Sequence, residues 1–211
     1  MEDAKFGSKG DVLKFFEEVG VSVGPRKGPN KRTNDQKELF NLRQYLTTLA
    51  ENDLLAFPLV VKKGESPDFM IREGSSDFWG MEITQATTKK YQQDLTRTEG
   101  SSGCDLLEGD GSVGDSPERE ACAAIIRAMR RKSMKTKKGK YRPASRYDLL
   151  IYVDVEAFFF DSNKSIQLLL PRLRRWKIQW QGLGRVSIIA SQNLYYDVTA
   201  NIIPLRLFEY E

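Results

Sequence analysis

Residues 67–84 read PDFMIREGSSDFWGMEIT, and this stretch decides which fold the chain can adopt. Two apolar runs flank Gly74-Ser75-Ser76, which has the composition of a turn, so the sequence predicts a β-hairpin with strands at 68–73 and 78–85. If the turn is a three-residue loop, Glu73 pairs with Asp77. Continuing the same pairing along both strands places Asp68 directly opposite Glu82.

The faces of this hairpin suggest a cation site. Side chains alternate along a strand, so Asp68, Glu82 and Thr84 share one face, while Met81 and Ile83 turn to the other face, which can be core. Two carboxylates whose Cβ atoms lie about 5 Å apart repel each other unless a cation lies between them. Oxygen ligands favour a hard cation, so the pattern predicts Mg²⁺ or Mn²⁺. The alternative is an ordinary solvent-exposed face whose acids pair with basic residues across the strands.

The composition limits both fold and chemistry. The chain has 211 residues, of which 40% are hydrophobic, and a formal net charge of +4, which suits one folded domain. It contains no histidine, which excludes Ser-His-Asp and Cys-His catalysis, and its two cysteines are too few for a structural zinc site. Because no apolar run has the length of a signal or membrane segment, we expect a cytoplasmic protein that does not insert into membranes.

Helical and strand patterns surround the hairpin on both sides. In chain order, the sequence predicts a helix over 34–52, a strand at 57–62, the hairpin, a helix from 117, a central strand at 147–155, a helix over 165–181 broken at Pro171, and strands within 186–191 and 195–210. The order is therefore helix, three strands, helix and strand, followed by a further helix and strands.

Other segments are predicted to lie outside these core elements. An N-terminal helix and a basic linker rich in Gly and Pro occupy 1–33, so the main α/β domain is expected at 34–211. After the hairpin a helix can continue from 87 to about 95, and Gly, Ser and acidic residues predict a mobile loop at about 99–116.

With its two carboxylates, its E-I-T sequence and this element order, the chain resembles the PD-(D/E)XK, or restriction endonuclease-like, nuclease superfamily over residues 34–156. The resemblance implies an α/β fold with an αβββαβ core, in which helices flank a mixed central sheet, plus a C-terminal helix and strands. It implies that Asp68, Glu82 and the carbonyl of Ile83 hold the metal. A glutamate of the first helix often completes such a site, and Glu38 is the best match, with Glu51 as second choice.

One position departs from the family pattern. The lysine of the motif is Thr84 here, and a threonine can only hydrogen-bond a water. A positive charge must then come from elsewhere, with Lys89, Lys90 or the basic second helix as candidates, unless the chain is an inactive descendant. Asp154 and Glu156 form a fallback acidic pair on one strand face.

A basic tract covers residues 127–146. It holds ten Lys and Arg residues and no acid, so it can neutralise several phosphates, and Tyr141 within it can stack on a base or sugar. The alternative is a solvated helix face with a lysine-rich loop. The candidate nucleic-acid contacts are Lys89, Lys90, Arg127, Arg130, Arg131, Lys135, Lys137, Lys138 and Lys140.

The sequence therefore predicts a Mg²⁺- or Mn²⁺-dependent endonuclease that hydrolyses phosphodiester bonds of nucleic acid, DNA in preference to RNA. The candidate catalytic residues are Asp68, Glu82, Thr84 and Glu38. The alternative is a catalytically inactive nucleic-acid-binding or protein-docking subunit on the same fold, in a larger assembly or a homodimer. Metal-dependent cleavage distinguishes the enzyme from both alternatives.

Overall fold

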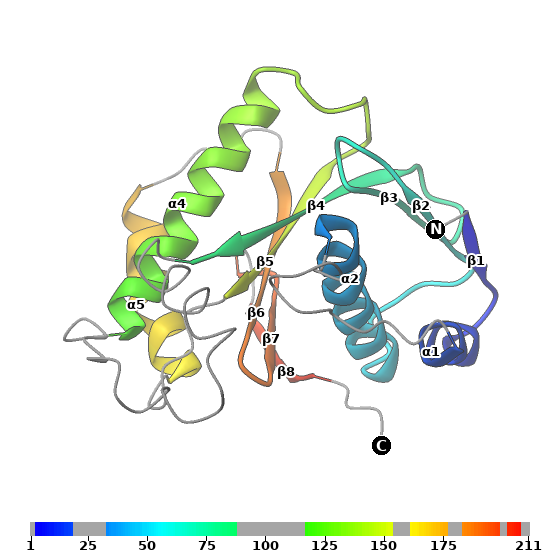
Figure 1. Ribbon diagram of the computed structural model, residues 1–211, viewed down its shortest axis with the longest axis horizontal. Helices are drawn as coiled ribbons and strands as arrows, with labels where there is room; N and C mark the ends of the chain where they lie inside the picture. Colours follow the sequence, from blue (N-terminus) through cyan, green and yellow to red (C-terminus); the bar gives the residue numbers. More distant parts are fainter. Residues whose placement is uncertain are drawn as a thin grey trace.

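The computed structural model describes residues 3–18, 33–87, 117–153, 161–176, 183–198 and 202–207. Within these ranges the chain forms four helices and one eight-stranded mixed sheet, the α/β class that the sequence predicts (Figure 1). In chain order the elements are β1 (Ala4–Phe6), α1 (Lys9–Glu18), α2 (Asn34–Glu51), β2 (Leu59–Lys63), β3 (Phe69–Glu73), β4 (Trp79–Ala86), α4 (Pro117–Lys137), β5 (Tyr147–Val153), α5 (Ser162–Trp176), β6 (Leu183–Ala190), β7 (Asn193–Tyr196) and β8 (Ile203–Arg206).

The strands lie in the sheet in the order in which they occur in the chain, from β1 at one edge to β8 at the other. Neighbouring strands are antiparallel, except that β5 runs parallel to both β4 and β6. Parallel neighbours require a long crossover, and α4 and α5 lie in these two connections. Figure 1 shows α4 and α5 on one side of the sheet and α1 and α2 on the other.

The pairing predicted for the β3–β4 hairpin is confirmed. Phe69 pairs with Met81 and Ile71 with Trp79, so the next position along places Asp68 opposite Glu82. Between these pairs, a Cβ on Gly80 would lie 2.6 Å from Cγ of Pro67 and 2.9 Å from Cδ1 of Tyr147. Only glycine therefore lets the turn before β3 approach β4 and β5 this closely.

Two hydrophobic cores, one on each face of the sheet, show which way each residue of β4 points. Met81 and Ile83 belong to the core under α1 and α2, whereas Ala86 belongs to the core under α4 and α5. Because side chains alternate, Glu82 and Thr84 share the α4 face with Ala86. Both are buried, at 3% and 6% exposure, so the alternative of a solvent-exposed hairpin face is wrong for these two residues.

Helix α2 begins with a capping box. The Thr33 hydroxyl accepts a hydrogen bond from the Gln36 backbone N–H at 3.2 Å, and the Gln36 side chain accepts one from the Thr33 N–H at 2.7 Å. These two bonds satisfy amide groups that a helix start otherwise leaves unpaired. The apolar stripe of Leu42, Leu46 and Leu49 is buried against the sheet, as its spacing predicts.

Two features differ from the sequence-based expectation. Strand β1 pairs with β2, and Val12 and Phe16 of α1 are buried in the first core, so the N-terminal residues add to the sheet as well as forming a helix. The break expected at Pro171 is wrong, because α5 continues through it. Pro171 is exposed while Leu169 and Leu173 on either side are buried, so packing of the apolar face keeps the helix intact.

Several expected features lie outside the described residues. These are most of the basic linker, all but the first residue of the helix expected from 87 to about 95, the loop at about 99–116, Lys89, Lys90, Asp154 and Glu156. None of the helices that the structure does describe combines the length and the apolar character needed to cross a bilayer.

Candidate functional site

Asp68 and Glu82 lie together where β3 begins and β4 passes beneath α4. Oδ2 of Asp68 accepts a hydrogen bond from the backbone N–H of Ile83 at 2.6 Å, which fixes the carboxylate across the hairpin. Glu82 is almost fully buried, and Asp68 is partly buried. The structure therefore brings together the two acids that the hairpin pairing predicts.

The charge of Glu82 is balanced by a lysine that the sequence analysis did not single out. Lys132 of α4 forms a buried ion pair with Oε1 of Glu82, and Nζ of Lys135 lies 3.7 Å from the same oxygen. Lys132 is only 8% exposed. A buried carboxylate is stable only when it is paired, and Lys132 supplies that partner.

A pattern in the sequence does indicate Lys132. It continues the buried stripe of α4, because Cys122, Ile125, Met129 and Lys132 recur three or four residues apart and are all buried. A lysine at such a position places its ammonium group against the sheet, where a partner must exist. The prediction of a basic tract over 127–146 did not separate this buried lysine from its exposed neighbours.

Asp68 is an acid that ionises with difficulty. Burial raises the pKa of its carboxyl group from 3.8 to about 7, and the negative charge of Glu82 adds to the rise. Glu38 contributes in the same direction, whereas the hydrogen bond from Ile83 and the charge of Lys132 act against it. The carboxylate pair therefore lacks a full complement of positive charge even with Lys132 in place.

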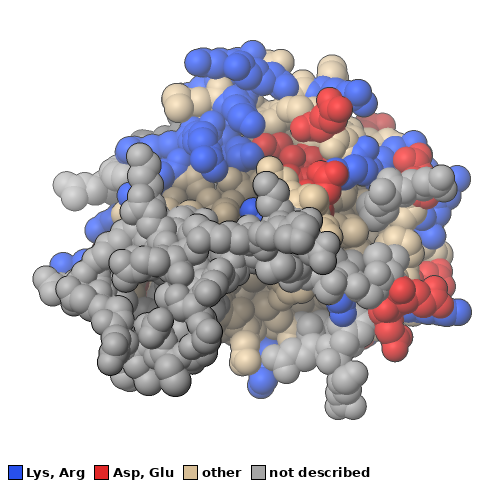
Figure 2. Space-filling model, in the orientation of Figure 1, with Lys and Arg blue, Asp and Glu red and all other residues tan. Residues whose placement is uncertain are grey.

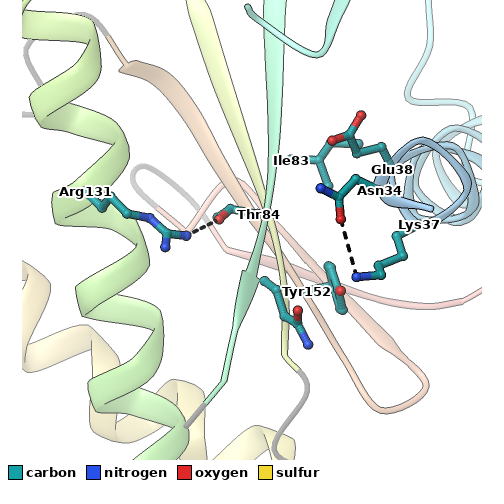
Figure 3. Close-up of a pocket in the computed structure, with 8 residues that line it drawn as sticks. Asn34, Lys37, Glu38, Ile83, Thr84, Arg131 and Tyr152 are labelled. Atoms are coloured by element: carbon teal, nitrogen blue, oxygen red, sulfur yellow. Dashed lines mark hydrogen bonds between the residues drawn. The ribbon is translucent and has the colours of Figure 1, made fainter. Parts of the chain in front are cut away.

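Glu38 lies on the opposite side of β4 from Glu82. It extends from α2, forms an ion pair with Lys63 and lines a pocket together with Asp68. Figure 3 shows Glu38 and Ile83 on the α2 side of the strand, whereas Thr84 points toward α4. Glu38 thus reaches Asp68 electrostatically without joining the face of Glu82. The second choice, Glu51, is at the far end of α2 and pairs with Lys9 at 3.2 Å.

Thr84 has a cationic partner from α4. Nη2 of Arg131 donates a hydrogen bond to the Thr84 hydroxyl oxygen at 2.8 Å (Figure 3). Both residues line a pocket at the end of β4 with Asn34, Lys37, Glu38, Ile83, Gln85 and Tyr152. The Thr84 hydroxyl group is therefore fixed by a guanidinium group of α4.

The basic tract divides into exposed and buried members. Figure 2 shows Lys and Arg gathered over the upper part of α4, with acidic side chains beside them. The exposed Lys and Arg residues of the tract are Arg127, Arg130, Arg131, Lys135, Lys137, Lys138, Lys140 and Arg142. Tyr141, in contrast, is 7% exposed and packs on the Tyr147 ring at 5.2 Å between centroids, so its expected stacking on a base is wrong.

The donor set of the site fits a hard divalent cation. Oε2 of Glu82 is buried and has no hydrogen-bond partner, and Asp68 retains a raised pKa, so both carboxylates gain from a nearby cation. With the Ile83 carbonyl, all of these ligands are oxygens, which suits Mg²⁺ or Mn²⁺. Within the described part of the chain, no three Asp, Glu or Cys side chains are grouped closely enough to share a metal ion.

In comparisons with protein-family models, curated proteins and solved structures, no match to this chain was found. The function of the site is therefore inferred from its geometry and chemistry.

Replacing Lys132 by Met is expected to destabilise the protein by about 3 kcal/mol, because Glu82 is left charged and buried without its closest partner. The measurement is the free energy of unfolding in urea. Lys135→Met is the matched control, since Lys135 is 45% exposed and its contact with Glu82 is longer, and it should cost less than about 1 kcal/mol. Equal losses for the two variants would contradict the assignment of Lys132 as the partner.

Asp68 should make the protein less stable as the pH rises. Its carboxyl group has a pKa of about 7 in the folded chain and near 3.8 in the unfolded chain, so between these values the folded state holds more protons. The free energy of unfolding then falls with rising pH in this window. Urea unfolding from pH 4 to 7 should show wild type losing stability relative to Asp68→Asn. Parallel pH profiles would show that Asp68 ionises normally.

Proposed function

We propose that the protein is a Mg²⁺- or Mn²⁺-dependent nuclease with a restriction endonuclease-like core and a PD-(D/E)XK-type site. Helix α2, strands β2, β3 and β4, helix α4 and strand β5 follow one another in the αβββαβ order of that core. The four strands β2 to β5 are neighbours in the mixed sheet, and α2 and α4 pack on its opposite faces. The acids lie on the central hairpin, where the family motif places them.

The observation that carries the proposal is the arrangement of Asp68, Glu82 and Lys132. Two carboxylates face each other across the hairpin, and one of them is joined by a buried ammonium group. The motif lysine is absent at Thr84, but a lysine side chain reaches the same face of β4 from α4. The site thus contains two carboxylates and one amine, the groups of a PD-(D/E)XK-type site. The amine comes from α4 instead of from β4.

Each group has a distinct part in hydrolysis. Asp68, Glu82 and the Ile83 carbonyl would hold the metal, which when bound lowers the pKa of a water and neutralises charge on the reacting phosphate. Lys132 places a positive charge beside this position, where negative charge develops on the phosphate. Arg131 fixes the Thr84 hydroxyl, so that the α4 face of β4 stays ordered around the carboxylates.

The substrate is proposed to be DNA, held through its phosphates. Two exposed cations of the basic tract lie beside the carboxylates, since Nζ of Lys135 is 3.7 Å from Oε1 of Glu82 and Arg142 lines a pocket with Asp68. The other exposed cations continue along α4 and the loop that follows it. Such contacts release counterions and give salt-dependent binding without sequence preference. The basic tract therefore supplies affinity, and the carboxylates supply the chemistry.

Nicking of supercoiled plasmid in Mg²⁺ or Mn²⁺ tests the proposal. Asp68→Asn and Glu82→Gln should abolish nicking, and Lys132→Gln should reduce it by about 100-fold or more, since each removes a group that acts on developing charge. Lys135→Gln, which removes the neighbouring exposed ammonium, should retain most of the activity. All four variants should bind DNA within a few-fold of wild type, because each retains the other exposed cations of the basic tract and Lys135→Gln removes at most one of several phosphate contacts.

The same assay identifies the alternative function. If purified wild type binds DNA with a strong salt dependence but never nicks it in either metal, the protein is an inactive binding module. If it neither binds nor nicks, the docking subunit becomes the better account. Nicking that is unaffected by Asp68→Asn would indicate a contaminating nuclease and contradict the proposed site.

A further inference from the structure

Tyr141 places an unpaired hydroxyl group at the carboxylate site. Its side chain is buried, and its hydroxyl oxygen has no hydrogen-bond partner. Oε2 of Glu82 is likewise buried and without a partner. Burying a polar atom without a hydrogen bond is unfavourable, so two such atoms in one site require an explanation.

The backbone holds Tyr141 in this position from both sides. The N–H of Arg142 donates to the Ser66 carbonyl at 3.0 Å, and the Ser66 hydroxyl donates to the Lys140 carbonyl at 3.1 Å. Ser66 precedes Asp68 by two residues, so the segment after α4 is attached to the turn that carries one of the acids. Tyr141 lies between the two attachment points and is directed into the site.

The electrostatics of Tyr141 identify its neighbours. Burial raises the pKa of its hydroxyl group. The negative charge of Glu82 and the side-chain contact with that carboxylate raise it further, followed by the charge of Asp68, while Arg131 acts in the opposite direction. A phenol has an ordinary pKa of about 10, so the hydroxyl group carries its proton at neutral pH and acts as a hydrogen-bond donor. The acceptor close to it that lacks a donor is Oε2 of Glu82.

We propose that Tyr141 is a positioning residue for the metal, in which its hydroxyl group donates to Oε2 of Glu82 and orients that carboxylate toward the cation. The inference rests on the proposed function, because it concerns the same site. A carboxylate oxygen has two lone pairs, so it accepts this hydrogen bond and still has one available for a metal. Outer partners of this kind orient metal-binding carboxylates and raise metal affinity.

A purely structural role does not account for this hydroxyl group. The Tyr141 ring already packs on Tyr147, and a phenylalanine would preserve that contact without a buried polar atom. Tyr147 shows the ordinary arrangement for comparison, since its hydroxyl group donates to the Arg142 carbonyl at 2.5 Å. The two neighbouring tyrosines thus differ in that only the hydroxyl of Tyr141 faces the carboxylates.

The experiment compares Tyr141→Phe with Tyr147→Phe in the full-length protein. The dissociation constant for Mn²⁺ is measured by isothermal titration calorimetry, and thermal melting is recorded without metal. We expect Tyr141→Phe to weaken Mn²⁺ binding about 10- to 100-fold, the usual effect of losing an outer partner of a metal ligand. Tyr147→Phe should leave Mn²⁺ affinity within about twofold, because its hydroxyl group bonds the Arg142 carbonyl and not a carboxylate. Without metal, the two variants should melt within a few degrees of each other, since each loses one hydrogen bond.

The possible outcomes separate this inference from the proposed function. If wild type binds Mn²⁺ and nicks plasmid but Tyr141→Phe has the same Mn²⁺ affinity, the positioning role is wrong and the nuclease proposal stands. If Tyr147→Phe weakens Mn²⁺ binding as much as Tyr141→Phe does, the Tyr141 hydroxyl group acts only through the local fold and the inference is overturned. If wild type neither binds Mn²⁺ nor nicks, the proposed function fails and this inference fails with it.

Discussion

The buried ion pair between Glu82 and Lys132 is the interaction on which the rest of the site depends. Glu82 is in a central strand and only 3% exposed, so its charge is tolerable only beside a cation. Lys132 provides it from α4, where it continues the buried stripe of Cys122, Ile125 and Met129 that faces the sheet. With this orientation set, Arg131 reaches Thr84 and the exposed cations of α4 lie beside the carboxylates.

Under the proposed function, Lys132 supplies the positive charge that Thr84 lacks. In the usual pattern the lysine lies two residues beyond the glutamate on the same strand, and Thr84 takes that place here. The position of the ammonium group matters for the chemistry, whichever backbone element carries it. The long flexible side chain of lysine lets α4 place that group on the face of β4 that holds Glu82. Burial and the charge of Glu82 raise the pKa of Asp68 even with Lys132 in place, so Asp68 is the acid that still gains from a further cation.

The sequence predicts the hairpin well because its constraints are local. Period-two alternation and a three-residue turn determine the pairing of β3 with β4, and with it the meeting of Asp68 and Glu82. The cation on Glu82 depends on how α4 packs, so the sequence shows it only through the buried stripe that ends at Lys132. Tyr141 is misjudged for a related reason, because its surroundings in the sequence are basic and exposed while two hydrogen bonds to Ser66 direct it inward.

The central claim is that Asp68 and Glu82 form a metal site beside the Lys132 ammonium. A crystal soaked in Mn²⁺ and measured for anomalous scattering tests this directly. The account predicts one anomalous peak about 2 Å from an oxygen of Asp68 and an oxygen of Glu82, with Lys132 next to it. A map at saturating Mn²⁺ with no peak between these two carboxylates, and with Lys132 still paired to Glu82, would contradict the account.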